Sequence, residues 1–157
     1  MSLVIFTCAV GYITSNSTIE TTNAIIGIVL VAIGAGAAGC LNMWYDSDID
    51  ALMTRTCLRP IPTGKITRNY ALIYGVALTV VSVILLNYFT NFLSAALLLF
   101  TILFYILVYT IWLKRKTPQN IVIGGAAGAL PPIIGWSIAT NSISIESISL
   151  FLIIFFW

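Results

Sequence analysis

Long apolar runs constrain the fold of this chain more than any other feature. An α-helix needs roughly 20 apolar residues to cross a bilayer, and runs of about that length lie near residues 24–44, 71–89, 92–113 and 121–140. Shorter apolar runs flank them at 3–13 and 147–157. Hydrophobic residues make up 60% of the 157 positions and charged residues only 8%, a composition that a water-soluble domain of this size does not carry. The sequence therefore predicts an all-α, polytopic transmembrane helix bundle.

The seven basic residues occupy only two of the loops between these runs. They are Arg55, Arg59, Lys65 and Arg68 in one loop and Lys114, Arg115 and Lys116 in the other. Cytoplasmic loops of membrane proteins carry an excess of Lys and Arg. On the loops of the opposite side the charged residues are Glu20 and Glu146. The pattern predicts an integral membrane protein whose basic loops face the cytoplasm, or the matrix if the membrane is mitochondrial.

A row of oxygen-bearing side chains follows the apolar run at 24–44. At 3.6 residues per turn, Asn42, Asp46 and Asp50 would stack on one helix face. Such oxygen ligands suit Mg²⁺ or another hard divalent cation. A solvated helix end is the alternative, but an extra carboxylate at a helix C-terminus typically costs up to about 1 kcal/mol, and an unpaired Asp deeper in the membrane costs more. We therefore predict Asn42, Asp46 and Asp50 as metal ligands.

Basic residues follow the acidic row within a few turns of chain. Arg55 and Arg59 are also spaced by four, so in a helix both guanidinium groups could lie on one side and donate to phosphate oxygens. Pro60, Pro62 and Gly64 predict a turn that folds the following bases back towards the acids. Acids that hold a metal beside bases that hold an anion are what a diphosphate substrate requires. The bases that the turn would fold back are Lys65 and Arg68.

Two stretches of small residues lie at 34–39 and 124–129. The first lacks a preceding strand and a following Lys-Ser/Thr, so it is not a phosphate-binding loop. Close helix packing explains both stretches, and small residues also leave room for a ligand. Pro131 and Pro132 must interrupt the last long span, and broken helices occur in membranes where they face protein or a cavity. Packing and an apolar cavity beside the acids both remain open.

Two stretches carry a family resemblance. Asn42 to Gly64, NMWYDSDIDALMTRTCLRPIPTG, resembles the first signature of the UbiA-type intramembrane prenyltransferases, in which Asn-x-x-x-Asp-x-x-x-Asp binds Mg²⁺ and the prenyl diphosphate. Lys114 to Trp136, KRKTPQNIVIGGAAGALPPIIGW, is similar to the members of that family that act on haem B. The resemblance implies transfer of a farnesyl group from farnesyl diphosphate to a vinyl group of haem B, which gives haem O. It also implies that Asn42, Asp46 and Asp50 hold Mg²⁺ as cofactor and that Arg55, Arg59 and Lys65 bind the diphosphate. The catalytic residues that it implies are Asn42, Asp46, Asp50, Arg55 and Arg59. It implies as well a bacterial or mitochondrial inner membrane, and partners in haem supply to cytochrome oxidase.

The resemblance also implies a longer protein. The family is expected to form a bundle of nine transmembrane helices with a second acidic motif downstream. Residues 1–157 are then one transmembrane domain, incomplete at both ends, with about four complete and two partial helices, and inactive in isolation. Two other functions remain open: a prenyltransferase acting on a quinone precursor, and a divalent-cation transport protein, which would more naturally place its site at the bilayer midplane and would not need the adjacent bases. No feature predicts nucleic-acid binding.

Overall fold

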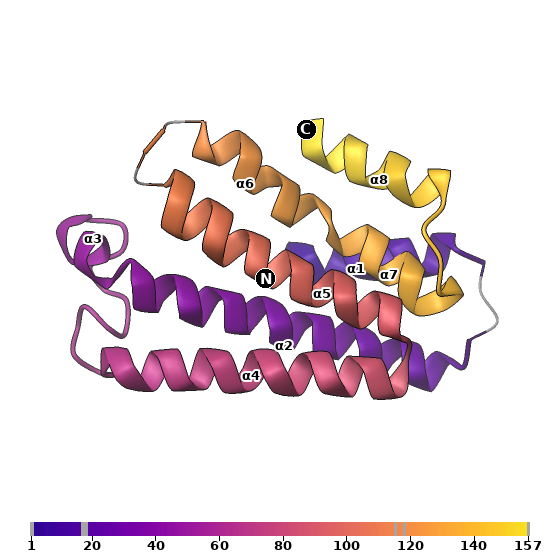
Figure 1. The fold of residues 1–157 in the computed structure, drawn as a ribbon, viewed down its shortest axis with the longest axis horizontal. Helices are drawn as coiled ribbons and strands as arrows, with labels where there is room; N and C mark the ends of the chain where they lie inside the picture. Colours follow the sequence, from indigo (N-terminus) through magenta and orange to yellow (C-terminus); the bar gives the residue numbers. More distant parts are fainter. Residues whose placement is uncertain (1, 17–18, 115, 118, 157) are drawn as a thin grey trace.

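The computed structural model describes residues 2–16, 19–114, 116–117 and 119–156, and these residues contain helices and turns but no strand. In chain order the elements are α1 (Ser2–Thr14), α2 (Thr21–Tyr45), α3 (Ser47–Leu52), α4 (Arg68–Phe89), α5 (Phe92–Leu103), the π-helix η1 (Phe104–Leu113), α6 (Asn120–Ala129), α7 (Pro131–Thr140) and α8 (Ile145–Phe156). The segments long and apolar enough to cross a membrane are Thr21–Tyr45, Arg68–Phe89, Phe92–Leu113 and Asn120–Thr140. The predicted all-α bundle is confirmed (Figure 1).

Two of the four spans are not continuous α-helices. The last span breaks between α6 and α7, where Pro131 has no N–H to donate and its fixed φ suits the first turn of a new helix. Leu130 O then accepts hydrogen bonds from Ile133 N at 3.0 Å and Ile134 N at 3.2 Å, which restarts the helix. This confirms the interruption predicted from the prolines. The third span changes from α5 to η1, a transition that no sequence signal predicted.

Close helix packing organises the bundle. Figure 1 shows α2 lying along α4 over most of its length; α5 also contacts both of these helices, and α1 packs against α7. At the α1–α7 contact, a Cβ on Gly135 would lie 1.9 Å from Cys8 O and one on Gly11 would lie 2.1 Å from Pro132 O, so only glycine permits this approach. The buried core beside it includes Leu30, Val31, Leu86, Leu98, Ile134 and Ile138.

The two basic loops lie at one end of the bundle. The C-terminal end of α2, the N-terminal end of α4, the end of η1 and the start of α6 meet there, at the left of Figure 1. Glu20 directly precedes α2 and Glu146 lies in the first turn of α8, at the other end. Arg115 and Trp157, which belong to the predicted basic loop and last apolar run, lie outside the described residues. The described charges are thus distributed as the sequence predicted.

A polar side chain ties the helices together at the end that carries Glu20. Asn91, at the turn between α4 and α5, accepts a hydrogen bond from Ser94 N at 2.8 Å and so caps α5. Its Nδ2 donates to Ser137 O on α7 at 2.7 Å and to Ile138 O at 3.4 Å. One amide therefore caps one helix and satisfies carbonyl groups near the end of another.

Candidate functional site

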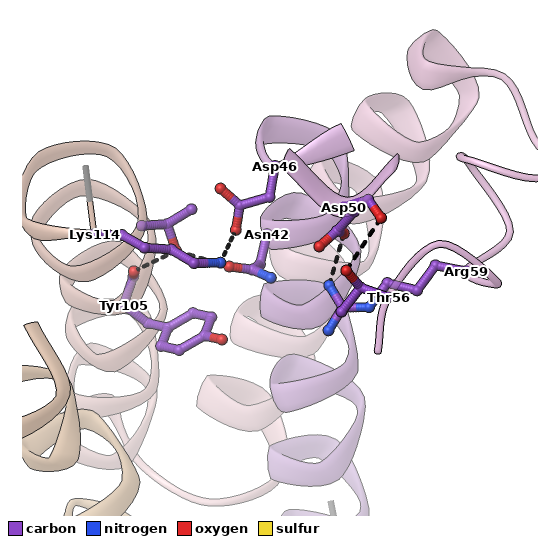
Figure 2. Close-up of polar contacts among 8 residues, drawn as sticks. Asn42, Asp46, Asp50, Thr56, Arg59, Tyr105 and Lys114 are labelled. Atoms are coloured by element: carbon purple, nitrogen blue, oxygen red, sulfur yellow. Dashed lines mark hydrogen bonds and ion pairs between the residues drawn. The ribbon is translucent and has the colours of Figure 1, made fainter. Parts of the chain in front are cut away.

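The predicted acidic row is buried at the junction of α2 and α3. Asp46 N donates to Asn42 O at 2.9 Å and Asp50 N donates to Asp46 O at 2.8 Å, so helical hydrogen bonding runs through the junction and keeps the three residues on one face. Their exposed fractions are 7% for Asn42, 0% for Asp46 and 2% for Asp50. Burial of this extent does not fit a solvated helix end. Figure 2 shows these side chains directed towards other helices and loops of the protein.

Asp46 is the most deeply buried member of the row. Its Oδ2 forms an ion pair with the Nζ of Lys114, which directly follows η1 (Figure 2). Its Oδ1 is buried and forms no hydrogen bond within the described part of the chain. Buried carboxylate oxygens in native proteins rarely lack a partner, because an unsatisfied buried polar atom is costly. The geometry therefore leaves one oxygen of Asp46 available to a cation.

Asp50 is held from the other side by the loop that follows α3. Arg59 Nη1 donates to Asp50 Oδ2 at 2.7 Å. Thr56 Oγ1 donates to the backbone oxygen of Asp50 at 3.1 Å, and Thr56 is itself buried. The side chain of Arg59 is 34% exposed, so the pair is accessible from outside the bundle on its arginine side.

Asn42 contacts η1. Thr110 Oγ1 lies 3.1 Å from Asn42 Oδ1 and 3.0 Å from Tyr105 O. A hydroxyl carries a single hydrogen, and the oxygen and nitrogen of an asparagine amide can exchange places by rotation of the side chain. If Thr110 donates to Tyr105 O, its lone pair can accept from the Asn42 amide nitrogen, which frees the amide oxygen for a cation. The π-helical register brings Thr110 and Tyr105 into this contact.

The structure separates the two arginines that the sequence predicted on one helix side. The expectation assumed that both arginines lie on one helix. This assumption is wrong, because α3 ends at Leu52 and residues 53–66 form turns instead of a helix. Arg59 reaches Asp50, whereas Arg55 is exposed and forms no ion pair with any described residue. The roles predicted for both arginines stay predictions.

The turn predicted after Arg59 is present. Gly64 has a φ of +74°, and Lys65 N donates to Pro60 O at 2.9 Å. Arg68 returns to the end of α2, where its Nε donates to Trp44 O at 3.1 Å and its guanidinium lies 5.5 Å from the centre of the Trp44 ring. Lys65 is exposed on the same loop. The chain thus folds back as expected, and Arg68 contacts the end of α2 that carries the acidic row.

Sequence reasoning missed Lys114, Thr110 and Thr56 as members of the site. Lys114 and Asp46 are 68 positions apart, as are Thr110 and Asn42, so no local spacing relates them. The available signal was indirect: Lys114 opens the second basic loop, at the same end of the bundle as the acids. Thr110 carried no signal, because a lone threonine in an apolar span is common.

An apolar cavity of about 310 Å³ lies among the helices, and its lining on α2 ends at Gly39, less than one helical turn before Asn42. Both small-residue stretches line it, together with α1, α5 and η1; its lining includes Val31, Gly39, Leu98, Tyr105, Gly128 and Ile134. A Cβ on Gly39 or Gly128 would meet no atom within 4 Å, so these glycines face free space. A Cβ on Gly34 would instead lie 3.0 Å from the Leu98 side chain. Close helix packing therefore explains Gly34, whereas Gly39 and Gly128 leave room in the cavity.

The acidic row could bind a cation only together with other ligands, such as the phosphate groups of a substrate. Within the described ranges, no three His, Cys, Asp or Glu side chains are gathered as a cage for a metal. Mg²⁺ is commonly held by one or two carboxylates together with substrate phosphates and water. Asp46 and Asp50, with the amide of Asn42, can supply that kind of partial shell. Bases then lie within reach of the same place, on the loop after α3 and at the end of η1.

Buried acids paired with bases at one end of a helix bundle, beside an apolar cavity, can hold a cation and an anionic group that carries an apolar tail. The chain matches the UbiA prenyltransferase family over residues 3–157 and belongs to that family, which confirms the resemblance of the two motifs. It is an integral membrane protein.

Its relatives narrow the comparison further. The chain is 73% identical over its full length to Protoheme IX farnesyltransferase of Pelagibacter ubique, 61% identical to Protoheme IX farnesyltransferase 2 of Mesorhizobium japonicum and 57% identical to Protoheme IX farnesyltransferase of Bartonella henselae. It spans 52%, 50% and 50% of these proteins respectively, about half the length of the curated relatives it matches. No solved structure matches the chain.

Proposed function

We propose that this chain is the diphosphate-binding part of an enzyme that transfers a farnesyl group from farnesyl diphosphate to a vinyl group of haem B, giving haem O. The similarity to protohaem IX farnesyltransferases supports this choice of acceptor over a quinone precursor. Membership of a prenyltransferase family argues against cation transport. One structural observation carries the proposal: Asp46 is fully buried on the same helix face as Asn42 and Asp50, has one oxygen without a donor, and pairs with Lys114 while Arg59 pairs with Asp50.

Asn42, Asp46 and Asp50 are the residues that would hold Mg²⁺. A bound Mg²⁺ would neutralise the negative charge that develops on the departing diphosphate. Each acid is balanced by a base, Lys114 on Asp46 and Arg59 on Asp50. Once a cation balances the carboxylates, these two bases can turn to phosphate oxygens without leaving a buried charge uncompensated.

The exposed bases complete the anion site. Arg55 and Lys65 lie on the loop after α3 and are exposed, so they can receive the diphosphate as it arrives from the aqueous side. Arginine offers two parallel donors to a phosphate, and lysine acts as a mobile point charge. By the positive-inside rule this face is the cytoplasmic face of a bacterial inner membrane, or the matrix face in a mitochondrion.

The farnesyl chain would lie in the apolar cavity. Its volume of about 310 Å³ is at the lower end of the range of roughly 300–1,000 Å³ that is usual for small-molecule sites. Departure of the diphosphate breaks the C–O bond and leaves an allylic cation, and the terminal vinyl carbon of haem B attacks it to form the new C–C bond. Water adds to the other vinyl carbon and loses a proton, which gives the hydroxyethylfarnesyl group. The chain contains no histidine, so none of its side chains offers an imidazole to the haem iron.

Binding of radiolabelled farnesyl diphosphate to the complete protein tests this function. Wild-type protein should bind in a Mg²⁺-dependent manner, and Asp46→Ala should abolish the Mg²⁺-dependent part. Glu20→Ala is the matched control, because it removes an exposed carboxylate at the other end of the bundle. Binding that ignores Mg²⁺ and survives Asp46→Ala would refute the proposal. Product analysis with haem B and with an aromatic quinone precursor as competing acceptors separates the two prenyltransferase functions.

A further inference from the structure

The cavity changes from open to fully buried along its length. Near the acidic row its lining residues include Gly39 and Tyr105, which are half-buried, and Gly128, which is exposed. Away from the acids it is lined by three side chains that are almost completely buried, Val31 at 1%, Leu98 at 2% and Ile134 at 1% exposed. We name these three side chains the cavity floor.

Positions along the helices give the depth of the floor. Val31 lies about 16 Å from Asn42 along α2 at roughly 1.5 Å of rise per residue. Leu98 lies on α5, about three turns before Thr110, the residue of η1 that contacts Asn42. Counted from the contact between Thr110 and Asn42, Leu98 and Val31 therefore lie at similar depth in the bundle.

The floor is part of the packed core of the bundle. Leu30, Leu86 and Ile138 belong to the same buried cluster as the floor residues and are 5%, 0% and 0% exposed. The Leu98 side chain also rests against Gly34, where even a methyl group would lie 3.0 Å from it. A ligand that extends beyond the floor must push apart a close-packed core, and interiors of this density resist such changes.

We propose that Val31, Leu98 and Ile134 set the length of the prenyl chain that the site accepts. This inference rests on the proposed function, because the diphosphate fixes one end of the substrate at the acids and the chain can then only extend into the cavity. A chain one isoprene unit longer than farnesyl would strike the floor. A chain one unit shorter would leave an unfilled apolar space and lose the contacts that bind it.

Chain-length preference in the complete protein tests the floor. The measurement is the ratio of kcat/KM for geranylgeranyl diphosphate to that for farnesyl diphosphate, at saturating Mg²⁺ and haem B. Leu98→Ala should raise this ratio by on the order of tenfold or more, since a single methylene in an apolar pocket already discriminates by about 10- to 200-fold. Leu41→Ala is the matched control: it makes the same change at a buried leucine that packs against Gly75 of α4 and does not line the cavity, and its ratio should stay at the wild-type value.

A milder variant guards against misfolding. Ile134→Val removes a single methyl group from the floor and should raise the ratio in the same direction by a smaller factor. A ratio that is unchanged in both floor variants of an otherwise active protein, or that shifts equally in Leu41→Ala, overturns the role of the floor and leaves the proposed function intact. A wild-type protein that uses no prenyl diphosphate of any length overturns the proposed function as well.

Discussion

Replacing Lys114 by methionine isolates the energetic role of the pair with Asp46. Methionine keeps an unbranched apolar stem and removes the ammonium group, so Asp46, which is 0% exposed and already has one oxygen without a donor, loses its partner. Removing one partner of a buried ion pair typically costs about 3–5 kcal/mol. The Lys114 side chain is 25% exposed, so water reaches the pair from one side, and we expect the lower end, about 3 kcal/mol.

The free energy of unfolding of the complete protein in mild detergent, followed by denaturant titration with tryptophan fluorescence, measures this cost. Lys116→Met is the control, since Lys116 is exposed in the same loop and its loss should change stability by no more than about 0.5 kcal/mol. In an Asp46→Asn background the cost of Lys114→Met should fall sharply, because a neutral amide needs no counter-ion.

Magnesium provides an independent measurement on the same site. If Asp46 is a cation ligand, Mg²⁺ should stabilise Lys114→Met more than wild type, because in wild type the cation must first displace the lysine. The unfolding measurement would refute the assignment of Lys114 and Asp46 as a buried, mutually dependent pair in either of two ways. Lys114→Met could lower the free energy of unfolding by less than about 1 kcal/mol, or it could lower it equally with and without the Asp46 carboxylate.

Three further predictions concern packing, capping and the second acid. Gly135→Ala should destabilise the protein by several kcal/mol, because its Cβ would lie 1.9 Å from Cys8 O. Gly39→Ala should be neutral or stabilise the protein by up to about 1 kcal/mol, because its Cβ meets no atom within 4 Å. Thermal unfolding of the two variants measures both effects. Asn91→Ala should cost more than the roughly 1 kcal/mol of a lost helix cap. Asn91→Asp should keep the cap but set a carboxylate oxygen against the α7 carbonyl oxygens in place of the donated hydrogen bond, and unfolding titrations of the two variants will separate the two contributions. Asp50→Asn should weaken Mg²⁺-dependent binding of farnesyl diphosphate while leaving a stable fold, measured by titration with Mg²⁺.

The sequence predicted the parts of the fold that depend on local properties. Hydropathy alone located the spans, and proline chemistry located the break before Pro131 and the turn that Gly64 closes with a φ of +74°. The helical period placed Asn42, Asp46 and Asp50 on one face, because the α2–α3 junction keeps its i to i+4 hydrogen bonds. The same reasoning failed to place Arg55 and Arg59, because the helix ends at Leu52 and both arginines lie in turns.

The sequence by itself therefore determined which segments are long and apolar enough to cross a membrane, which end carries the bases and which residues form the acidic row, since each follows from the chemistry of neighbouring residues. Tertiary structure alone decided that Lys114 balances Asp46 across 68 positions and that Arg59, not Arg55, balances Asp50. It also decided that the two small-residue stretches enclose a cavity between them. The physical reason is that a charge partner or a cavity wall is chosen by proximity in space, which helix packing creates and no local spacing encodes.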